Sequence, residues 1–532
     1  MARIGKYVID SLTRSMYEDS RCIFREYIQN AADQIDLARK EHLDEGDHYE
    51  IHVRIFREQR RIEIEDTATG VSRENRETLK DVATSQKKRG EHKGFRGIGR
   101  LGGLGYCTSL IFETSAKGED IKTIMKWDAA KMNQMVDDEA DDREAGSVID
   151  ECTCFEEQPE KSEKHYFKVI MENVTDDRLL DIDNVRNYLS MVSPVDYPTR
   201  FNQFSAKIKK YVKENGLKLD TYNLYLGDEY GEEQIFKGYT TKVIDGHNGD
   251  YDIKDIVFFD KKDNEGKFIY WGWYSISELR GQIPMYNTAY GIRLRCKNIQ
   301  VGDERTCRNF FSAEGDKRFS QWFYGEIFVE TKELMPDARR DYLRECEFRS
   351  IFEDYIRKHF LVLKERCKEA SDVRGAQKEI KKAVQELDKI EKKKQTGFLS
   401  SEEQQKSEQK FKEFKQKREK AEQKLKKLQT ENKQKDSPLS FIFEKELLES
   451  QPSSIQPVIG QYEEPDNILA EAPATYQTKT NIKLRTDNDI YKKFTNKEKL
   501  LINTIYNTIY NAFPDEGMRE SLIKKIEREL TK

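Results

Sequence analysis

The sequence contains little cysteine and histidine and has no long apolar run. Its 532 residues include 8 cysteines and 7 histidines. Cys152 and Cys154 lie close together, but no second pair stands at the spacing of a structural zinc site. No segment reaches the roughly 18 consecutive apolar residues that cross a bilayer, and the first residues lack the apolar core and cleavage site of a signal peptide. We therefore expect a soluble, cytoplasmic protein with reduced cysteines and no membrane partner.

Net charge is also small. Lysine and arginine total 93, aspartate and glutamate total 98, and the formal net charge is −5. This balance gives no global reason to expect nucleic-acid binding, although a local basic strip remains compatible with it. Charged residues make up 36% of the chain, which exceeds the usual share in a globular protein. The length predicts about three to four domains.

Two mixed regions precede a change of composition at residue 361. Residues 1–175 predict an α/β domain with a helix over 20–42, surface loops at 137–144 and 155–165, and strands over 51–56, 61–66, 109–116, 121–129 and 167–174. Residues 176–360 are rich in aromatic side chains, which can pack a separate core. Their patterns predict helices over 201–214 and 340–360 and strands near 234–243, 255–259, 267–274, 290–302 and 322–330.

Residues 361–436 are rich in lysine, glutamate and glutamine. Gly397 can end one helix there, and Ser400 with Glu403 has the spacing of a capping box for the next. We predict an antiparallel coiled-coil hairpin over 361–436, a linker over 437–485 and a C-terminal helical dimerisation segment over 486–532. The apolar stripes that predict the hairpin run through Ile380, Ala383, Leu387 and Ile390, and through Phe411, Phe414, Arg418, Ala421, Leu425 and Leu428.

Three polar residues recur on the helix predicted over residues 20–42. Spacings of four and three place Glu26, Asn30 and Asp33 on one face, and apolar residues flank that face. An asparagine oxygen can complete the coordination shell of Mg²⁺, and a glutamate one turn earlier can deprotonate a water. Taken alone, this pattern is also typical of an ordinary solvated helix face.

Two further motifs follow the strand over residues 61–66. Asp66 at the strand end can accept a hydrogen bond from an exocyclic amine, and Gly70 in the same turn lets a flat ring approach the backbone. Six glycines then occur within residues 94–105, where backbone N–H groups can approach phosphates. An ordinary strand-ending turn and a flexible loop are the simpler interpretations of each motif alone.

The three motifs in this order resemble those of the GHKL ATPase superfamily. REYIQNAAD (25–33) resembles the first box, DTATGV (66–71) the second and GFRGIG (94–99) the third. Two departures exist. Ala68 stands where the family usually has glycine, and residues 164–174 lack the Gly-Thr that often precedes the last pocket strand. The resemblance implies an N-terminal Bergerat-type α/β sandwich that binds ATP and Mg²⁺.

The resemblance also implies a role for each matching residue. Glu26 corresponds to the general base, Asn30 to the Mg²⁺ ligand, Asp33 to a contact near the base or ribose, and Asp66 to the residue that reads adenine. Gly70 lets the base approach. The residues that correspond to the phosphate-binding hinge of the ATP lid are Gly94, Gly97, Ile98 and Gly99.

The second region resembles the middle domain of the heat shock protein 90 chaperones. Residues 291–304 followed by 325–345 match a strand pair that leads to a turn with an arginine that reaches the γ-phosphate. LMPDARRD (334–341) fits that turn and places Arg340 at the sensor position. Lys297 is a second candidate, and a solvated helix start is the structural alternative. The resemblance implies a transducer-like α/β middle domain and therefore, with the C-terminal helices, an α+β protein.

We expect an ATPase that acts as an ATP-gated dimeric clamp or chaperone on a protein client. One alternative is a MORC-like or bacterial antiphage-defence ATPase that acts on DNA or with an effector protein. Residues 371–436 hold 20 basic and 13 acidic residues, a local charge of +7 that could contact nucleic acid. Another alternative is a nucleotide-sensing scaffold that does not hydrolyse ATP.

Overall fold

The computed structural model describes residues 4–44, 46–84, 93–94, 97–247, 249–434 and 438–439. The chain divides into two compact units, Met1–Ser450 and Gln451–Lys532. The second unit and nearly all of the predicted linker and C-terminal helical segment lie outside the described residues. None of the described helices is long and apolar enough to cross a membrane.

An eight-stranded sheet forms the first layer, in the order β5-β4-β3-β6-β2-β1-β7-β8. Alternate residues of β1 and β2 are buried, as the alternation in the sequence predicts. Neighbours pair antiparallel except β1 and β7, which run parallel. The strands are β1 Glu50–Phe56, β2 Arg61–Asp66, β3 Ser109–Ser115, β4 Ile121–Asp128, β5 Thr153–Pro159, β6 Tyr166–Glu172, β7 Asn223–Asp228 and β8 Gly231–Gln234.

Three strands of this sheet, β5, β7 and β8, differ from the expectation. β5 covers part of the loop predicted at 155–165; it is an edge strand, and all of its side chains are exposed or half-buried. β7 and β8 follow the predicted boundary at residue 175 but complete the first sheet.

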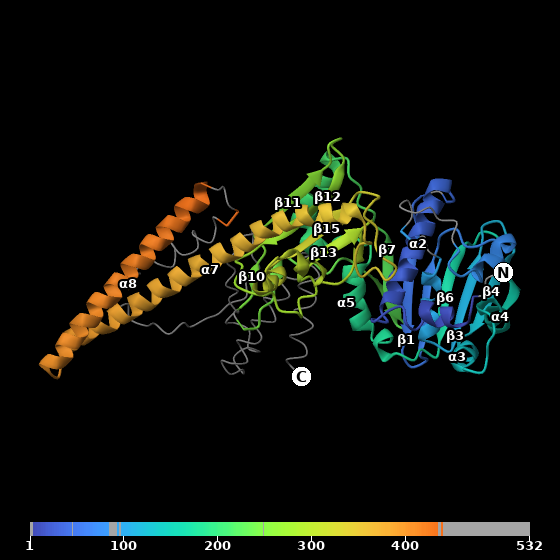
Figure 1. Cartoon of the computed structure of the whole chain (residues 1–532), viewed down its shortest axis with the longest axis horizontal. Coiled ribbons are helices and arrows are strands. Elements are labelled where there is room, and N and C mark those ends of the chain that lie inside the picture. The colour runs from blue at the N-terminus through green and yellow to red at the C-terminus, as the bar shows by residue number, and fades with distance from the viewer. Residues whose placement is uncertain are drawn as a thin grey trace, which may run out of the picture. The chain divides into compact units, whose positions relative to one another are not determined.

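Helices pack on one face of the sheet around a single apolar core that also includes residues from β7. α2 lies along this face (Figure 1) and buries Ile23, Phe24, Tyr27 and Ile35. It occupies most of the helix predicted over residues 20–42. The helices of this layer are α1 Tyr7–Leu12, α2 Cys22–Glu41, α3 Ala129–Asp137, α4 Ala145–Cys152 and α5 Ile182–Val192, with 3₁₀ turns η1 Arg73–Leu79, η2 Gly99–Gly105 and η3 Asp177–Leu179.

A five-stranded sheet, ordered β11-β12-β15-β13-β14, forms the second region. Apolar clusters cover both of its faces, one with α6 and one with α7, so β12 and β15 are buried almost throughout. The elements are α6 Asn202–Glu214, β9 Lys242–Val243, β10 Tyr251–Asp252, β11 Asp255–Lys262, β12 Phe268–Ile276, β13 Gly291–Cys296, β14 Ile299–Val301 and β15 Tyr324–Val329, with 3₁₀ turns η4 Thr199–Phe201, η5 Thr306–Phe310 and η6 Glu314–Trp322.

A buried ionic cluster lies inside this second region. Glu326 on β15 is fully buried and pairs with Lys237 at 2.8 Å and with Arg295. The hydroxyl of Tyr197 donates to the same carboxylate. Attraction to the two cations outweighs the effect of burial and lowers the pKa of Glu326 to about 2.

Two long helices follow, α7 Glu347–Thr396 and α8 Ser401–Gln434. α7 crosses the second sheet and continues beyond it (Figure 1), so the predicted boundary at residue 361 falls inside one helix. Lys393 pairs with Glu403, and Lys424 with Asp372 at 3.0 Å, so α8 runs back along α7. Of the predicted stripes, Ala383, Leu387, Ile390 and Ala421 are buried and Arg418 is exposed.

Gly397 follows α7 with a φ of +88°, and Ser400 Oγ accepts a hydrogen bond from the N–H of Glu403 at 3.2 Å. The backbone conformation of Gly397 ends α7, and the hydrogen bond to Ser400 caps the start of α8, at the positions that the sequence predicts.

Candidate functional site

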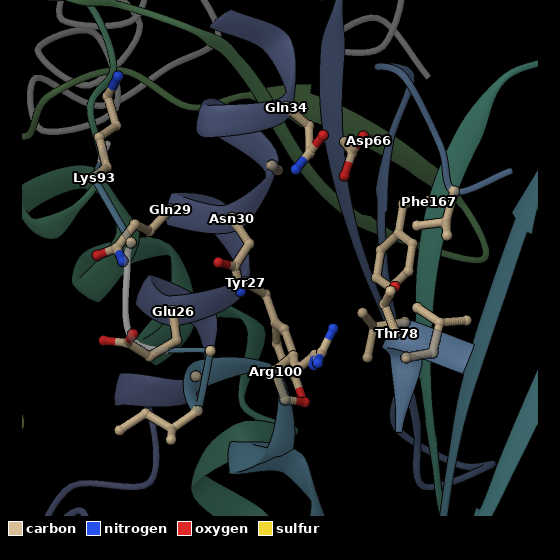
Figure 2. Close-up of a pocket in the computed structure, with 18 of the residues that line it drawn as sticks. Glu26, Tyr27, Gln29, Asn30, Gln34, Asp66, Thr78, Lys93, Arg100 and Phe167 are labelled. Carbon is tan, nitrogen blue, oxygen red and sulfur yellow. The ribbon is translucent and has the colours of Figure 1, made fainter. Parts of the chain in front are cut away.

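A cavity of about 620 Å³ opens beside α2 in the first domain. Figure 2 shows Glu26 and Asn30 on the α2 side and Asp66 and Phe167 on the opposite side. η1, the glycine-rich segment and a turn from the second region complete the wall. The sequence motifs therefore meet around one space, although more than 300 residues separate the first from the last.

Helix α2 presents Glu26, Gln29 and Asn30 to the cavity, since their spacing places them on one helix face. Glu26 is only 7% exposed, and its Oε1 lies 3.5 Å from Nε of Arg25. Among the described residues, that oxygen accepts no hydrogen bond. A carboxylate held in this way can accept a proton from a bound water.

Asp33 lies on the same helix but outside the cavity wall. Its carboxylate oxygens accept hydrogen bonds from the backbone N–H of Lys93 at 2.7 Å and of Gly94 at 2.9 Å. Asp33 thus fixes the start of the glycine-rich segment. Its expected contact with the base or ribose gains no support from this geometry.

Asp66 ends β2 and lines the cavity beside an apolar wall. Its Oδ1 accepts a hydrogen bond from the N–H of Ala68 at 3.1 Å, which holds the carboxylate against its own turn. Ala68 itself is fully buried and does not line the cavity. A buried acceptor beside such a wall suits a flat heteroaromatic base. The apolar residues of the wall are Ile64, Val71, Leu79, Phe167 and Val169.

Gly70 lines the cavity, but glycine is required there because of a close backbone contact with Ser115, outside the cavity wall. Its φ is +65°, and a Cβ there would lie 1.9 Å from the carbonyl oxygen of Ser115. The missing side chain lets the turn after β2 pack against the end of β3.

The glycine-rich segment lies against the polar face of α2. A Cβ on Gly94 would lie 2.4 Å from Nε2 of Gln29, and one on Gly99 would lie 2.8 Å from Oε2 of Glu26. Side chains at these positions would fill the space that separates the segment from the helix. The residues of this segment that line the cavity are Gly94, Gly97, Ile98, Gly99 and Arg100.

A turn over residues 336–343 carries Arg340 into the cavity wall, and α7 begins only at Glu347, not at residue 340 as the sequence pattern predicts. Pro336 and Leu343 form an isolated bridge at the base of the turn. Arg340 is 7% exposed, has a φ of +57°, and donates from Nη2 to the carbonyl of Lys93 at 2.5 Å.

The other end of the Arg340 guanidinium, Nη1, has no hydrogen-bond partner among the described residues. Burial lowers the pKa of Arg340, and the charge of the nearby Glu26 carboxylate acts in the opposite direction. A guanidinium remains charged in proteins, so a buried donor of this kind suits an anionic group in the cavity.

Lys297, the second candidate from the sequence, lies in the turn between β13 and β14. It is half-buried, and burial lowers its pKa. It does not line the cavity. The structure therefore brings Arg340 to the site and leaves Lys297 outside it.

Sequence reasoning missed several cavity residues. Gln29 is 4% exposed and borders the glycine-rich segment, and its position inside the first motif could have indicated this. Arg100 lines the cavity from within the glycine-rich segment, and Thr78 and Phe167 line it from elements that carry no recognised motif. Their roles depend on the tertiary fold, which the local spacing of residues does not reveal.

The residues present fit a nucleotide with a divalent cation. No group of three or more His, Cys, Asp or Glu side chains in the described part of the chain could hold a metal ion. A cation bound here would therefore take most of its ligands from phosphate and water, as Mg²⁺ does beside nucleotides. Asn30 is half-buried in the wall beside Gly94 and can supply one oxygen.

Comparison with known proteins agrees with this geometry. Residues 25–156 match the family described as histidine kinase-, DNA gyrase B-, and HSP90-like ATPase. A search of curated proteins found no match. The matched segment contains Glu26, Asn30, Asp66 and the glycine-rich segment. Residues 25–156 are therefore similar to the ATPase domains of the histidine kinase, DNA gyrase B and HSP90-like family.

Proposed function

We propose that this chain binds ATP with Mg²⁺ in the cavity beside α2 and hydrolyses it. The observation that carries the proposal is the meeting of Glu26 and Arg340, from two separately packed regions, in the wall of one cavity. Asp66 lies on the opposite side of the same cavity. A base and a phosphate chain thus have separate places to bind.

The adenine ring would lie along the apolar wall, with its exocyclic amine donating to Asp66. Asp66 is 4% exposed, so the exchange of its hydrogen bonds with water is limited. A base without that donor would lack this hydrogen bond to the buried carboxylate, which lowers its binding free energy relative to adenine.

The phosphates would lie between the glycine-rich segment and α2, because the absence of side chains there lets backbone N–H groups approach. Asn30 would hold the Mg²⁺ ion. When bound, that ion neutralises charge that develops on the phosphate oxygens.

Two side chains then serve the chemical step. Glu26 orients a water and accepts its proton as the water attacks the terminal phosphorus. Arg340 offers its Nη1 group to the oxygens that gain charge as the leaving diphosphate departs.

The first experiment compares steady-state ATP hydrolysis and ATP binding by the wild-type chain and Glu26→Gln. We expect the variant to bind Mg²⁺-ATP and to turn it over at least about 100-fold more slowly. Glu41→Gln is a matched control, since Glu41 lines the same cavity on the same helix but is exposed. An equal loss in both variants, or no binding by the wild type, would overturn the assignment.

For the biological role, we propose an ATP-gated dimeric clamp acting on a protein client. Its support is the position of Arg340 on a second domain, since closure on nucleotide would couple the two domains. We also propose that α7 and α8 form a coiled-coil arm that transmits this movement. Light scattering with and without a non-hydrolysable ATP analogue tests the dimer. An unchanged monomer in both conditions would contradict it.

An alternative role is action on DNA or with an effector protein, and the local +7 charge of residues 371–436 favours it. Replacing Lys410, Lys412 and Lys420 on α8 with glutamate should then abolish salt-dependent DNA binding and leave ATP turnover unchanged. A chain that binds ATP without hydrolysing it would instead be a nucleotide-sensing scaffold.

A further inference from the structure

Lys93 is a buried lysine at the start of the glycine-rich segment, and its ammonium group faces away from the cavity (Figure 2). Nζ lies 2.5 Å from Oδ2 of Asp36 and 3.5 Å from Oδ2 of Asp220. It also donates to the hydroxyl oxygen of Tyr222 at 2.6 Å, and that hydroxyl donates to Asp36 at 2.7 Å. The side chain of Lys93 is only 2% exposed.

The backbone of the same residue also makes two hydrogen bonds. Its N–H donates to Asp33, and its carbonyl accepts the hydrogen bond from Nη2 of Arg340. A reciprocal contact lies nearby, since Arg25 donates to the carbonyl of Arg339 at 2.7 Å. Two hydrogen bonds thus attach the turn that carries Arg340 to the first domain. Arg340 donates to a carbonyl of the first domain, and Arg25 of the first domain donates to a carbonyl of the turn.

The Arg340 guanidinium is thus hydrogen-bonded to a backbone carbonyl of the first domain. A backbone carbonyl has no rotamers, so its position follows from what anchors its own residue. The side chain of Lys93 is removed from solvent, while those of Asp36 and Asp220 are 36% and 16% exposed. Attraction between charges is stronger at a partly buried position than in water, so these pairs hold the ammonium in place.

We propose that Lys93 is a positioning residue for Arg340. Its ammonium, fixed by Asp36, Asp220 and Tyr222, holds the carbonyl of residue 93 where it directs the guanidinium into the cavity. The inference rests on the proposed ATPase function. The side chain of Lys93, which faces away from the cavity, would then affect the rate of ATP hydrolysis and not the affinity for nucleotide.

Part of this anchor belongs to the second region. Asn298, in the turn between β13 and β14, donates to the backbone carbonyl of Asp220 at 2.6 Å. The same second region that supplies Arg340 therefore also supports the acidic partner of Lys93. Both connections exist only when the two regions are docked.

The test measures kcat, KM and ATP affinity for Lys93→Met in the full chain. We expect kcat to fall between about tenfold and about 100-fold, as for a misplaced catalytic group, with ATP affinity within about twofold. Lys218→Met is the matched control: Lys218 pairs with the same Asp220 carboxylate at 2.7 Å, but its side chain is 81% exposed. It should leave kcat unchanged.

A double variant shows whether Lys93 acts through Arg340. If it does, Lys93→Met should lower kcat no further in an Arg340→Met chain, because the group that it positions is gone. Additive losses, or a loss of ATP affinity equal to the loss of kcat, would overturn the inference. A wild-type chain without ATPase activity would overturn the proposed function instead.

Tyr222→Phe provides a second, milder variant in case Lys93→Met fails to fold. It removes only the hydroxyl that contacts Lys93 and Asp36 and keeps the ring. A smaller decrease of kcat that disappears in the Arg340→Met background would support the inference. An unchanged kcat in a folded Tyr222→Phe chain, together with an unchanged kcat in any folded Lys93 variant, would contradict it.

Discussion

Gly70 lets the turn after β2 pack closely against the end of β3, because it has no side chain. A Cβ would lie 1.9 Å from the carbonyl oxygen of Ser115, and the φ of +65° is itself unfavourable for other residues. We predict that Gly70→Ala lowers the free energy of unfolding by more than about 1 kcal/mol. Thermal or urea unfolding of the full chain measures this loss.

A variant at Gly118 distinguishes the effect of the steric clash at Gly70 from the effect of backbone strain. Gly118 also has a positive φ, +91°, but no atom lies within 4 Å of the position of a Cβ there. Gly118→Ala should therefore cost only the strain of its backbone conformation and destabilise the chain less. Equal losses in the two variants would show that the contact with Ser115 does not matter.

The site residues that the sequence could predict are those whose positions depend on local structure. Glu26, Asn30 and Asp66 reach the cavity because helix spacing and a strand end place them, and both features are local. The hydrogen bond between Asp33 and the N–H of Lys93, in contrast, joins residues 60 positions apart. No spacing rule indicates that Asp33 holds backbone N–H groups, because that role exists only after the glycine-rich segment docks on α2.

At the scale of elements, α7 joins two environments in one helix. Its first half packs on the second sheet through Phe352, Ile356 and Phe360, and its second half packs on α8 through Leu387 and Ile390. Fifty residues at a rise of 1.5 Å give roughly 75 Å. The helical periodicity of the sequence is continuous, so it does not show where packing on the sheet ends and packing on α8 begins. The boundary predicted at residue 361 therefore lies within one helix.

Ala421 tests the packing of α8 on α7. It is 2% exposed, while the neighbouring residue Lys420 is exposed. We predict that Ala421→Glu detaches α8 locally, because a carboxylate without a partner is costly to bury. Hydrogen exchange along α8 should accelerate at least about tenfold, while ATP binding remains unchanged.

Lys420→Glu makes the control for this prediction, since it introduces the same carboxylate one position away on the exposed side of the helix. Its exchange rates should match those of the wild type. Slow exchange along α8 in the Ala421→Glu chain would mean that α8 does not depend on its contact with α7.

At the scale of the whole molecule, the first sheet is completed from a distance. β7 pairs in parallel with β1, although about 170 residues separate them. Strand patterns predict strands, but they do not identify partners across such a separation, and parallel pairing leaves no hairpin signal. This is why the sequence predicts two mixed regions, 1–175 and 176–360, but does not predict that β7 and β8 join the sheet of the first.

The buried Glu326 predicts how the stability of the second region depends on pH. Lys237 and Arg295 lower its folded pKa to about 2, below the ordinary value of 4.5. A lowered carboxylate pKa contributes stability above pH 4.5 and loses it as pH falls from 4.5 toward 2. We predict that Glu326→Gln is destabilised by about 3 kcal/mol at pH 7, and that the difference from wild type narrows as pH falls through this range.

Urea unfolding followed by tryptophan fluorescence measures this difference, because Trp271, Trp273 and Trp322 all lie in the second region. Glu265→Gln is the control, since Glu265 pairs with Lys267 at 2.8 Å on the surface and both side chains are mostly exposed. Its stability should follow the wild type at every pH, because an exposed pair contributes little. A pH-independent difference between Glu326→Gln and wild type would mean that the cluster stabilises the fold by its shape and hydrogen bonds, and not by the charge of Glu326.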